Sequence, residues 1–397
     1  MKSDWKECTL AELGEIVGGA TPSTKDEQNY GGDIAWITPK DLSTLKGRFI
    51  SRGERNITEK GLRSCSAQIM PKNAVLFSSR APIGYVAIAA NPVCTNQGFK
   101  SIVANSDNDP MFLYYLLKYN MNAIEAMGSG TTFKEVSGST MRGIRVYVPI
   151  SKAEQQRIAA ILSALDEKIA INREINDNLQ QQAQAIYHER FETVSPNDLP
   201  SDWRIVTLGE VATISNKSFN PLKEPEILLE HYSIPAFDEA RFPVFELSTS
   251  IKSNKFIIDV SCFMISKLNP TTKRVWKPYC LTGNAVCSTE FIVYKAKDKT
   301  ITDFLYSVID SNSFSDFMCS HVTGSTGSRQ RTTPSDTLSY ELILPSEDEL
   351  AEFQSLVSPM YAQIRINAIE NDRLKRLRDS LLPKLMSGEI DVSTIQL

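Results

Sequence analysis

Two long stretches of the chain, residues 152–190 and 347–382, have almost no Gly or Pro and carry apolar residues at a helical spacing. In the first stretch, two interleaved series of positions seven residues apart hold apolar side chains or Asn: Ile158, Leu165, Asn172, Leu179 and Ile186, and Leu162, Ile169, Asn176 and Ala183. The second stretch repeats both series 195 residues later: Phe353, Met360, Asn367, Leu374 and Leu381, and Val357, Ile364, Asn371 and Arg378. An apolar seam with this period is typical of a coiled coil. We therefore predict two long helices, the second ending at Pro383, whose ring clashes with the preceding turn.

The asparagines of the two seams predict how the helices pair. If the helices run antiparallel with Glu174 opposite Ile369, Asn172 faces Asn371 and Asn176 faces Asn367. Each amide can then donate to and accept from its partner, whereas mispairing would bury amides against leucine at about 1–3 kcal/mol for each unsatisfied group. We predict that these four asparagines are helix-pairing residues, with exposure to water or to a partner subunit as the alternative.

The segments that precede each helix contain short β-branched or aromatic runs separated by turn residues. Strands are predicted at 34–37, 74–77, 83–89, 99–103 and 144–148, with one amphipathic helix near 111–127. These features predict a compact mixed domain of about 150 residues before the first long helix.

The whole pattern occurs as an internal repeat, with two copies along the chain. "DWKECTLAELGEIV" at residue 4 recurs as "DWRIVTLGEVATI" at 202, "VCTNQGFKSIVA" at 93 as "VCSTEFIVYKA" at 286, and "GSGTTFKEVSGS" at 128 as "GSTGSRQRTTPS" at 324. We therefore predict an α+β fold made by tandem duplication, with the two helices forming an antiparallel coiled coil. The expected parts are domain 1 (1–150), a central helix (151–195), domain 2 (196–345) and a C-terminal helix with a tail (346–397). The first helix would span roughly 57 Å at ~1.5 Å per residue, and the two domains would be held apart by a rigid rod.

Composition limits the class of protein. With 42% hydrophobic residues and no apolar run near the ~18 residues that a membrane helix needs, we expect a soluble, cytoplasmic protein without a membrane partner. The seven cysteines are scattered and the three histidines lie far apart, so we predict reduced thiols and no metal site. Residues 1–150 carry 17 Lys and Arg against 14 Asp and Glu, although the whole chain has a net charge of -4. The basic cluster in residues 40–63 could track phosphates or form a solvated face.

Sequence motifs for catalysis are not found. The Gly-rich stretch at 18–42 resembles a phosphate-binding loop, but Thr24 stands where the second Gly is needed and Asp26 follows Lys25 in place of a hydroxyl. The chain also has neither the Asn/Asp-Pro-Pro-Tyr/Phe type motif of a methyltransferase nor a Gly-rich S-adenosylmethionine loop. Any chemistry must therefore come from partner subunits.

Several motifs resemble one known family, the specificity subunits of type I restriction-modification enzymes. The resemblance covers nearly the whole chain and is carried by "GGATPST…YGGDIAWITPKDL" at 18, "LFSSRAPIGYVAIA" at 76, "SIPAFDE" at 233, "ISKLNPTTKRVW" at 265 and "LRDSLLPKLMSGEID" at 377. It implies a non-catalytic chain in which each domain is a target recognition domain that reads one half of a bipartite site in double-stranded DNA. It further implies that the helices set the gap between the two half-sites and bind two methyltransferase subunits. Restriction/translocase subunits are then expected to join the complex, and S-adenosylmethionine, ATP and Mg are expected on these partner subunits.

Candidate DNA contacts are the basic, amide and hydroxyl side chains of the loops, which suit phosphates and base edges. In the first domain they are Lys40, Arg48, Arg80, Tyr85, Asn96, Gln97 and Lys134. In the second domain they are Lys267, Asn269, Lys273, Arg274, Ser328, Arg329, Gln330 and Arg331. Turn capping is the competing role for Asn96 and Gln97, and Trp276 is expected in the core.

Two other functions stay open at this point. The chain could be the recognition subunit of a related two-part restriction enzyme that cuts beside its site. It could also be an enzyme with two diverged α/β catalytic domains, in which the loops at Gly128 and Gly324 hold the substrate. Robust turnover by the purified chain alone would favour the enzyme.

Overall fold

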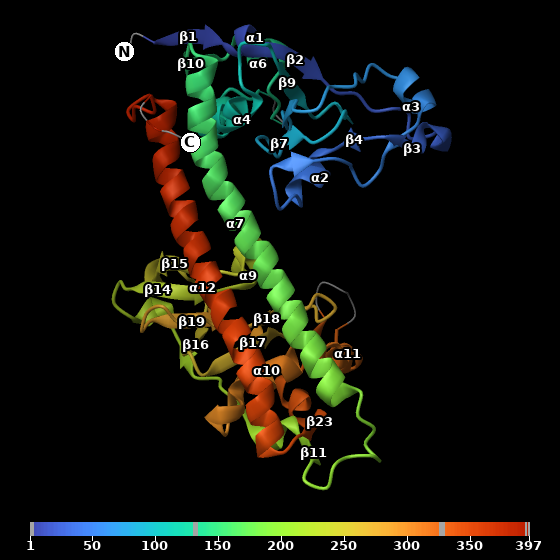
Figure 1. The fold of residues 1–397 in the computed structure, drawn as a ribbon, viewed down its shortest axis with the longest axis vertical. Coiled ribbons are helices and arrows are strands. Elements are labelled where there is room, and N and C mark those ends of the chain that lie inside the picture. Colours follow the sequence, from blue (N-terminus) through green and yellow to red (C-terminus); the bar gives the residue numbers. More distant parts are fainter. Residues whose placement is uncertain (1–3, 130–133, 325–329, 394, 396–397) are drawn as a thin grey trace. The chain divides into compact units, whose positions relative to one another are not determined.

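The computed structural model describes residues 4–129, 134–324, 330–393 and 395, and the chain separates into two compact units. Unit 1 comprises Met1–Ala170 and Arg373–Leu397, and unit 2 comprises Ile171–Asp372. Both boundaries fall inside long helices, α7 (Lys152–Tyr187) and α12 (Glu347–Met386) (Figure 1). Each unit therefore holds one mixed domain together with a segment of each helix.

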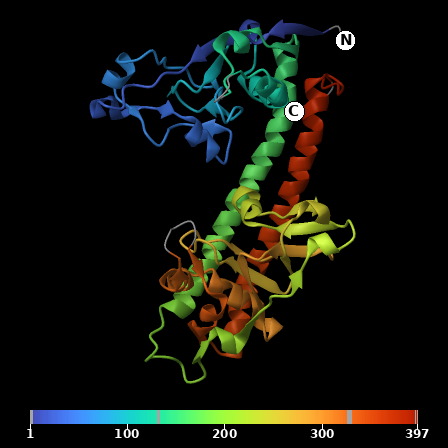
Figure 2. The same ribbon diagram turned by 180° about the vertical axis from the view of Figure 1, so that it is seen from behind.

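Unit 1 contains short strands and helices before α7. In chain order they are β1 (Trp5–Thr9), α1 (Leu10–Leu13), β2 (Gly14–Gly18), β3 (Tyr30–Ile34), β4 (Trp36–Ile37), α2 (Pro39–Ser43), β5 (Phe49–Ile50), α3 (Glu59–Arg63), β6 (Val75–Phe77), β7 (Val86–Ala89), β8 (Cys94–Thr95), β9 (Lys100–Ala104), α4 (Pro110–Tyr119), α5 (Met121–Ala126), α6 (Gly138–Gly143) and β10 (Arg145–Pro149). The main sheet has the order β2-β9-β6-β7-β5. In addition, β1 pairs antiparallel with β10 and β4 pairs parallel with β8. Figure 2 shows β1 beside the start of α7 from behind.

The helix predicted near 111–127 is two helices, α4 and α5. The Asp109 side chain caps α4 by accepting the N–H of Phe112, and Pro110 occupies the first turn, where its missing N–H costs nothing. Asn120 leaves the helical conformation at φ -87° and ψ 6° and bonds the Leu116 carbonyl through its amide. The break follows from this local hydrogen bond, which the apolar periodicity does not reveal.

The hydrophobic core of unit 1 extends from the sheet onto both long helices. Phe112 and Leu116 of α4 are buried with Ile158 of α7 and Leu385 of α12 in one cluster. The helix segments are thus part of this domain's core, which explains why they belong to the unit.

Unit 2 is built in a similar way. Its elements before α12 are β11 (Arg204–Thr207), α8 (Leu208–Val211), β12 (Ala212–Ile214), β13 (Ser218–Phe219), β14 (Leu228–Tyr232), α9 (Ile234–Ala240), β15 (Val244–Leu247), β16 (Lys255–Ile257), β17 (Cys262–Ser266), β18 (Val275–Trp276), β19 (Ala285–Ser288), β20 (Phe291–Ala296), α10 (Thr302–Ile309), α11 (Asn312–Ser320), β21 (Val322–Thr323), β22 (Arg331–Thr332) and β23 (Glu341–Leu344). Its sheets have the orders β12-β20-β17-β18 and β13-β16-β19-β14-β15, and β11 pairs antiparallel with β23. Phe304 of α10 packs with Tyr187 of α7 and Phe353 of α12 in the core.

The prediction that Pro383 ends the second helix is wrong. Helix α12 passes through both Pro359 and Pro383 and ends at Met386. Leu385 and Met386 are buried against the unit 1 core, and this burial outweighs the lost backbone hydrogen bond. The chain turns at Gly388, whose positive φ of 71° suits a glycine after a helix. Among the residues that the structure describes, we find no helix long and apolar enough to cross a bilayer.

Candidate nucleic-acid interface

Three segments that are far apart in the sequence meet in unit 1 through backbone hydrogen bonds. The N–H of Ser79 donates to the Gly98 carbonyl (2.7 Å), and the N–H of Val136 donates to the Ser79 carbonyl (2.8 Å). The N–H of Ala81 donates to the Lys134 carbonyl (3.2 Å), and Arg80 and Glu135 form an antiparallel bridge. We call these residues, 79–81, 98 and 134–136, the unit 1 junction. It brings together the predicted contacts Arg80 and Lys134.

The side chains of the unit 1 junction include one ion pair. The Nε of Arg80 lies 2.9 Å from Oε2 of Glu135, and the Nζ of Lys100 lies 3.5 Å from Oε1 of the same carboxylate. Lys134 is exposed, and Tyr85 is half-buried against a hydrophobic cluster beneath the loop. The predicted contacts therefore lie at the surface, with Arg80 held in place by Glu135.

The turn before β9 and the Gly-rich stretch adjoin this junction. Asn96 caps the turn, because its Oδ1 accepts the N–H of Gly98 (2.9 Å), and the exposed Gln97 accepts a hydrogen bond from the Thr21 hydroxyl. A Cβ on Gly19 would lie 1.9 Å from the Asn96 carbonyl oxygen, so only glycine allows this approach. The Gly-rich stretch thus packs against the turn that carries two of the predicted contacts.

Unit 2 repeats this backbone arrangement. The N–H of Lys267 donates to the Glu290 carbonyl (2.9 Å), and the N–H of Thr332 donates to the Lys267 carbonyl (3.1 Å). The N–H of Asn269 donates to the Gln330 carbonyl (2.9 Å), and Leu268 and Arg331 form an antiparallel bridge. We call residues 267–269, 290 and 330–332 the unit 2 junction. It gathers four predicted contacts: Lys267, Asn269, Gln330 and Arg331.

The unit 2 junction also holds an ion pair. Arg331 places Nε 3.0 Å from Oε2 and Nη2 3.2 Å from Oε1 of Glu290, and these hydrogen bonds raise the pKa of the guanidinium. Asn269 has a positive φ of 51°, and its side chain bonds Thr271 and Thr272, so it shapes the turn. The predicted contacts Ser328 and Arg329 lie outside the described residues.

The search for basic and amide residues missed Glu135 and Glu290. Both carboxylates hold an arginine that was predicted to contact DNA. Glu135 could have been found from the sequence repeat, because it aligns with Arg331 in the second copy of the loop.

The assignment of Arg48 to DNA contact is wrong. This residue is only 8% exposed, and its guanidinium donates to the Tyr115 hydroxyl (3.1 Å), the Ser163 carbonyl (3.1 Å) and Glu167 (2.5 Å). Asp166 lies 3.7 Å away. Arg48 therefore connects the segment before β5 to α7, and a buried cation with these partners has no access to a phosphate.

Three other predicted contacts have acidic partners. Arg274 is bound side-on by Asp238 at 2.6 and 2.9 Å and its side chain is 14% exposed, which removes it from the candidate interface. Lys273 donates to the Asp310 carbonyl at 2.7 Å, and Trp276 beside it is buried, as expected. Lys40 is exposed and pairs with Glu54 at 2.6 Å.

The four predicted helix-pairing asparagines all lie in unit 2. The Nδ2 of Asn172 donates to Oδ1 of Asn371 (3.0 Å), and the Nδ2 of Asn367 donates to Oδ1 of Asn176 (2.8 Å). Each pair shares one hydrogen bond, and the other amide groups bond elsewhere: Asn172 also to Glu370, Asn367 also to Gln363 and Asn176 to the Ile364 carbonyl. Asn172 and Asn367 are buried.

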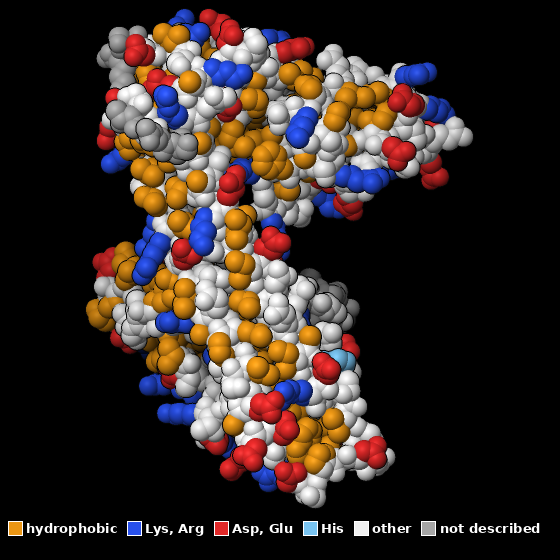
Figure 3. Space-filling view, in the orientation of Figure 1, with side chains coloured by type: hydrophobic (Ala, Val, Ile, Leu, Met, Phe, Trp, Pro, Cys, Tyr) orange, Lys and Arg blue, Asp and Glu red, His pale blue; other side chains and the backbone are white. Residues whose placement is uncertain are grey.

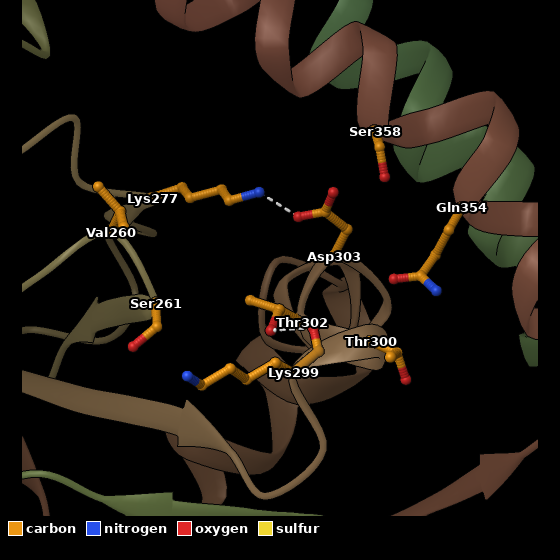
Figure 4. Close-up of a pocket in the computed structure, with 9 residues that line it drawn as sticks. All are labelled: Val260, Ser261, Lys277, Lys299, Thr300, Thr302, Asp303, Gln354 and Ser358. Carbon is orange, nitrogen blue, oxygen red and sulfur yellow. Dashed lines mark hydrogen bonds and ion pairs between the residues drawn. The ribbon is translucent and has the colours of Figure 1, made fainter.

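Charge and cavities give little further guidance. On the face shown in Figure 3, basic side chains are interspersed with acidic ones. A cavity of about 460 Å³ in unit 2 is lined by Lys277, Asp303 and Lys299 together with hydroxyl side chains, and Lys277 forms an ion pair with Asp303 (Figure 4). Its lining does not include residues of the unit 2 junction.

Comparisons with known proteins agree on one family. Residues 2–181 match the model for the type I restriction modification DNA specificity domain. The chain is 33% identical to the type I restriction enzyme MjaIX specificity subunit of Methanocaldococcus jannaschii, over 99% of this chain and 95% of that relative. It is 28% identical to the HindI specificity subunit of Haemophilus influenzae over 36% of this chain and 32% of the relative. A crystal structure of the S subunit of a type I restriction-modification system from M. genitalium shares the fold, with a TM-score of 0.59, 17% identity and 96% coverage of both chains.

Proposed function

The chain belongs to the family of type I restriction-modification DNA specificity subunits, and we propose that its two domains each read one half of a bipartite DNA site. As a specificity subunit the chain is non-catalytic and gives the complex its DNA sequence preference. The proposed boundaries are 1–150 and 196–345 for the two recognition domains.

The repetition of the junction is the observation that carries this proposal. Both junctions use the same three backbone hydrogen bonds between corresponding segments, at the loops where the basic and amide residues gather. The pairings β1-β10 and β11-β23 match as well, as do the sheet orders β2-β9-β6-β7 and β12-β20-β17-β18. This agreement supports a duplicated fold with two equivalent reading surfaces. The different side chains on the two surfaces support different half-sites.

The gap between the half-sites is proposed to be set by α7 and α12 as an antiparallel coiled coil. The amide pairs support this register, since a shift would leave buried amides unsatisfied at about 1–3 kcal/mol each. Cysteine pairs test it: Asn172→Cys with Asn371→Cys should cross-link readily, and Asn172→Cys with Asn367→Cys less well. The opposite ranking would contradict the antiparallel register.

The partners follow from the family. Two methyltransferase subunits are proposed to bind the helices and restriction/translocase subunits to join them, in the cytoplasm beside the DNA. S-adenosylmethionine, ATP and Mg are proposed to act on those subunits. The net charge of -4 supports DNA binding by the assembled complex rather than tightly by this chain alone, because net repulsion opposes association with phosphates.

Domain exchange tests the proposal. The chain is produced with its methyltransferase partner, and methylated bases are mapped across a host genome. The wild-type complex should give an adenine-methylated motif of two halves separated by unspecified bases. Replacing residues 1–150 by the corresponding domain of a relative should change one half only. A continuous motif, or a change of both halves together, would refute the proposal that each domain recognises one half-site.

A further inference from the structure

The two junctions carry the same kind of ion pair at exchanged positions. Their backbone bonds match Arg80 with Leu268, Glu135 with Arg331 and Gly98 with Glu290. In unit 1 the arginine comes from the segment after β6, and the glutamate comes from residues 134–136. In unit 2 the corresponding residues 330–332 supply the arginine, and the glutamate comes from the turn before β20. The Arg–Glu pair is present in both copies although neither residue keeps its place.

The exposure of the two pairs is nearly equal. The side chains of Arg80 and Glu135 are 44% and 31% exposed, and those of Arg331 and Glu290 are 43% and 30% exposed. A pair this exposed contributes little to stability, so fold stability gives no strong reason for both junctions to hold one. Two hydrogen bonds to Glu290 fix the plane of the Arg331 guanidinium, and one hydrogen bond to Glu135 restrains the Arg80 guanidinium. This restraint lowers the entropy lost when either side chain binds a ligand.

A fixed, half-exposed guanidinium matches the edge of guanine. Arginine donates two parallel hydrogen bonds to guanine O6 and N7 in the major groove, and this contact discriminates strongly against other bases. We propose that Arg80 and Arg331 each read a guanine in their own half-site and that Glu135 and Glu290 are positioning residues that orient them. This inference rests on the proposed function, and it adds the residues that determine specificity.

Arginine-to-lysine variants test the reading. Lys keeps the positive charge and loses the planar fork. In the assembled complex, Arg331→Lys should lower discrimination at one guanine of one half-site about ten- to hundredfold, and Arg80→Lys should do so in the other half. The measurement is methylome mapping, followed by methylation rates on duplexes that carry each base at each motif position. Arg145→Lys is the matched control, because Arg145 of β10 pairs with Glu7 of β1 outside both junctions, and this variant should leave the motif unchanged.

Reversing the pair separates reading from stability. Arg331→Glu alone opposes two carboxylates, and adding Glu290→Arg restores an ion pair of the same charges. The thermal unfolding temperature should return toward the wild-type value, whereas the guanine preference should stay lost. Recovery of the original motif in the double variant would overturn the proposal, since it would make the pair only structural. Glu290→Gln should lower the preference for guanine at the same motif position, with little change in the thermal unfolding temperature.

The outcomes distinguish this inference from the proposed function. A wild-type complex without a bipartite motif would refute the function itself. If the wild-type motif is bipartite and neither Arg80→Lys nor Arg331→Lys changes it, only the proposal that these arginines read guanine is refuted. If the arginine variants weaken DNA binding equally for every base and reduce its salt dependence, the arginines contact phosphates. That result would also overturn the proposal that they read guanine. The same relaxation from Arg145→Lys would refute the assignment to the junctions.

Discussion

Unit 1 and unit 2 attach their domains to the long helices with different chemistry. Both units pack apolar side chains against the helices, and unit 1 adds a polar network: Arg48 and the Tyr115 hydroxyl meet Asp166 of α7, and Arg378 of α12 reaches the same carboxylate at 2.7 Å. In unit 2 the contact is aromatic: Phe191, beyond the end of α7, packs 5.4 Å from Phe304 and 5.2 Å from Phe353, measured between ring centroids. A similar architecture therefore adds an ionic network to its apolar contact in one copy and a cluster of aromatic rings in the other.

The difference shows which parts of the repeat can vary. Arg378 breaks the apolar seam pattern of α12, and the structure gives the reason, since it neutralises Asp166 together with Arg48. The motif "FLYYLLK" at 112 and its copy "FLYSVID" at 304 keep the apolar face of the helix and change the rest. Tyr115 bonds Asp166 on α7, whereas Ser307, its counterpart, bonds Tyr361 on α12. The core positions are repeated, and the polar contacts are specific to each copy.

The largest expected effect comes from the aromatic contact. Phe353→Ala removes a ring from the fully buried cluster and should lower the free energy of unfolding of unit 2 by about 3–5 kcal/mol. Hydrogen exchange resolved by residue should show the loss in unit 2 amides first. An equal loss of protection in unit 1 would contradict the assignment of Phe353 to the unit 2 core.

Arg48→Met should cost about 2–3 kcal/mol in unit 1, because it removes one of the two arginines beside the part-buried Asp166. The exposure of Glu167, the other acidic partner of Arg48, keeps the cost below that of a fully buried ion pair. The matched control is Arg241→Met in unit 2, whose pair with Asp177 is exposed and should contribute within about 0.5 kcal/mol. Denaturant unfolding followed by unit-specific hydrogen exchange measures both. Similar costs for the two variants would show that the unit 1 network is not a stabilising contact.

The sequence predicted the long helices well because their apolar period is sustained over many turns. The predicted starts at residues 152 and 347 agree with α7 and α12. The end at Pro383 failed because Leu385 and Met386 pack against residues near the N-terminus. The two-residue strands β5 and β8 were not predicted, since their pairing depends on segments that are far apart in the sequence.

The candidate site was predictable in its loops and less so in its side chains. The repeats and basic residues identified the segments that form both junctions. Charge alone could not reveal that Arg48 is buried, because its partner Asp166 lies 118 positions later, on α7. For the same reason Glu290 was missed: its role depends on Arg331, which the fold brings beside it.

The smallest expected effect concerns Asp310, which stands where the unit 1 copy of the motif has Lys118. Its carboxyl is buried at the end of α10, and burial raises its pKa, although Lys273 and Gln180 act in the opposite direction. Below the unfolded value near 3.8 both states are protonated, so Asp310 causes no loss of stability there. As the pH rises from there through the raised folded pKa, the unfolded chain ionises first, and the free energy of unfolding falls. Asp310→Asn cannot ionise, so the stability of this variant relative to wild type should increase with pH across that window. Lys118→Gln in unit 1 is the matched control and should change little over the same range. A relative stability of Asp310→Asn that stays flat or falls with pH would show that ion pairing with Lys273 outweighs burial, and unit 2 would then share with unit 1 an ionic attachment beneath its aromatic one.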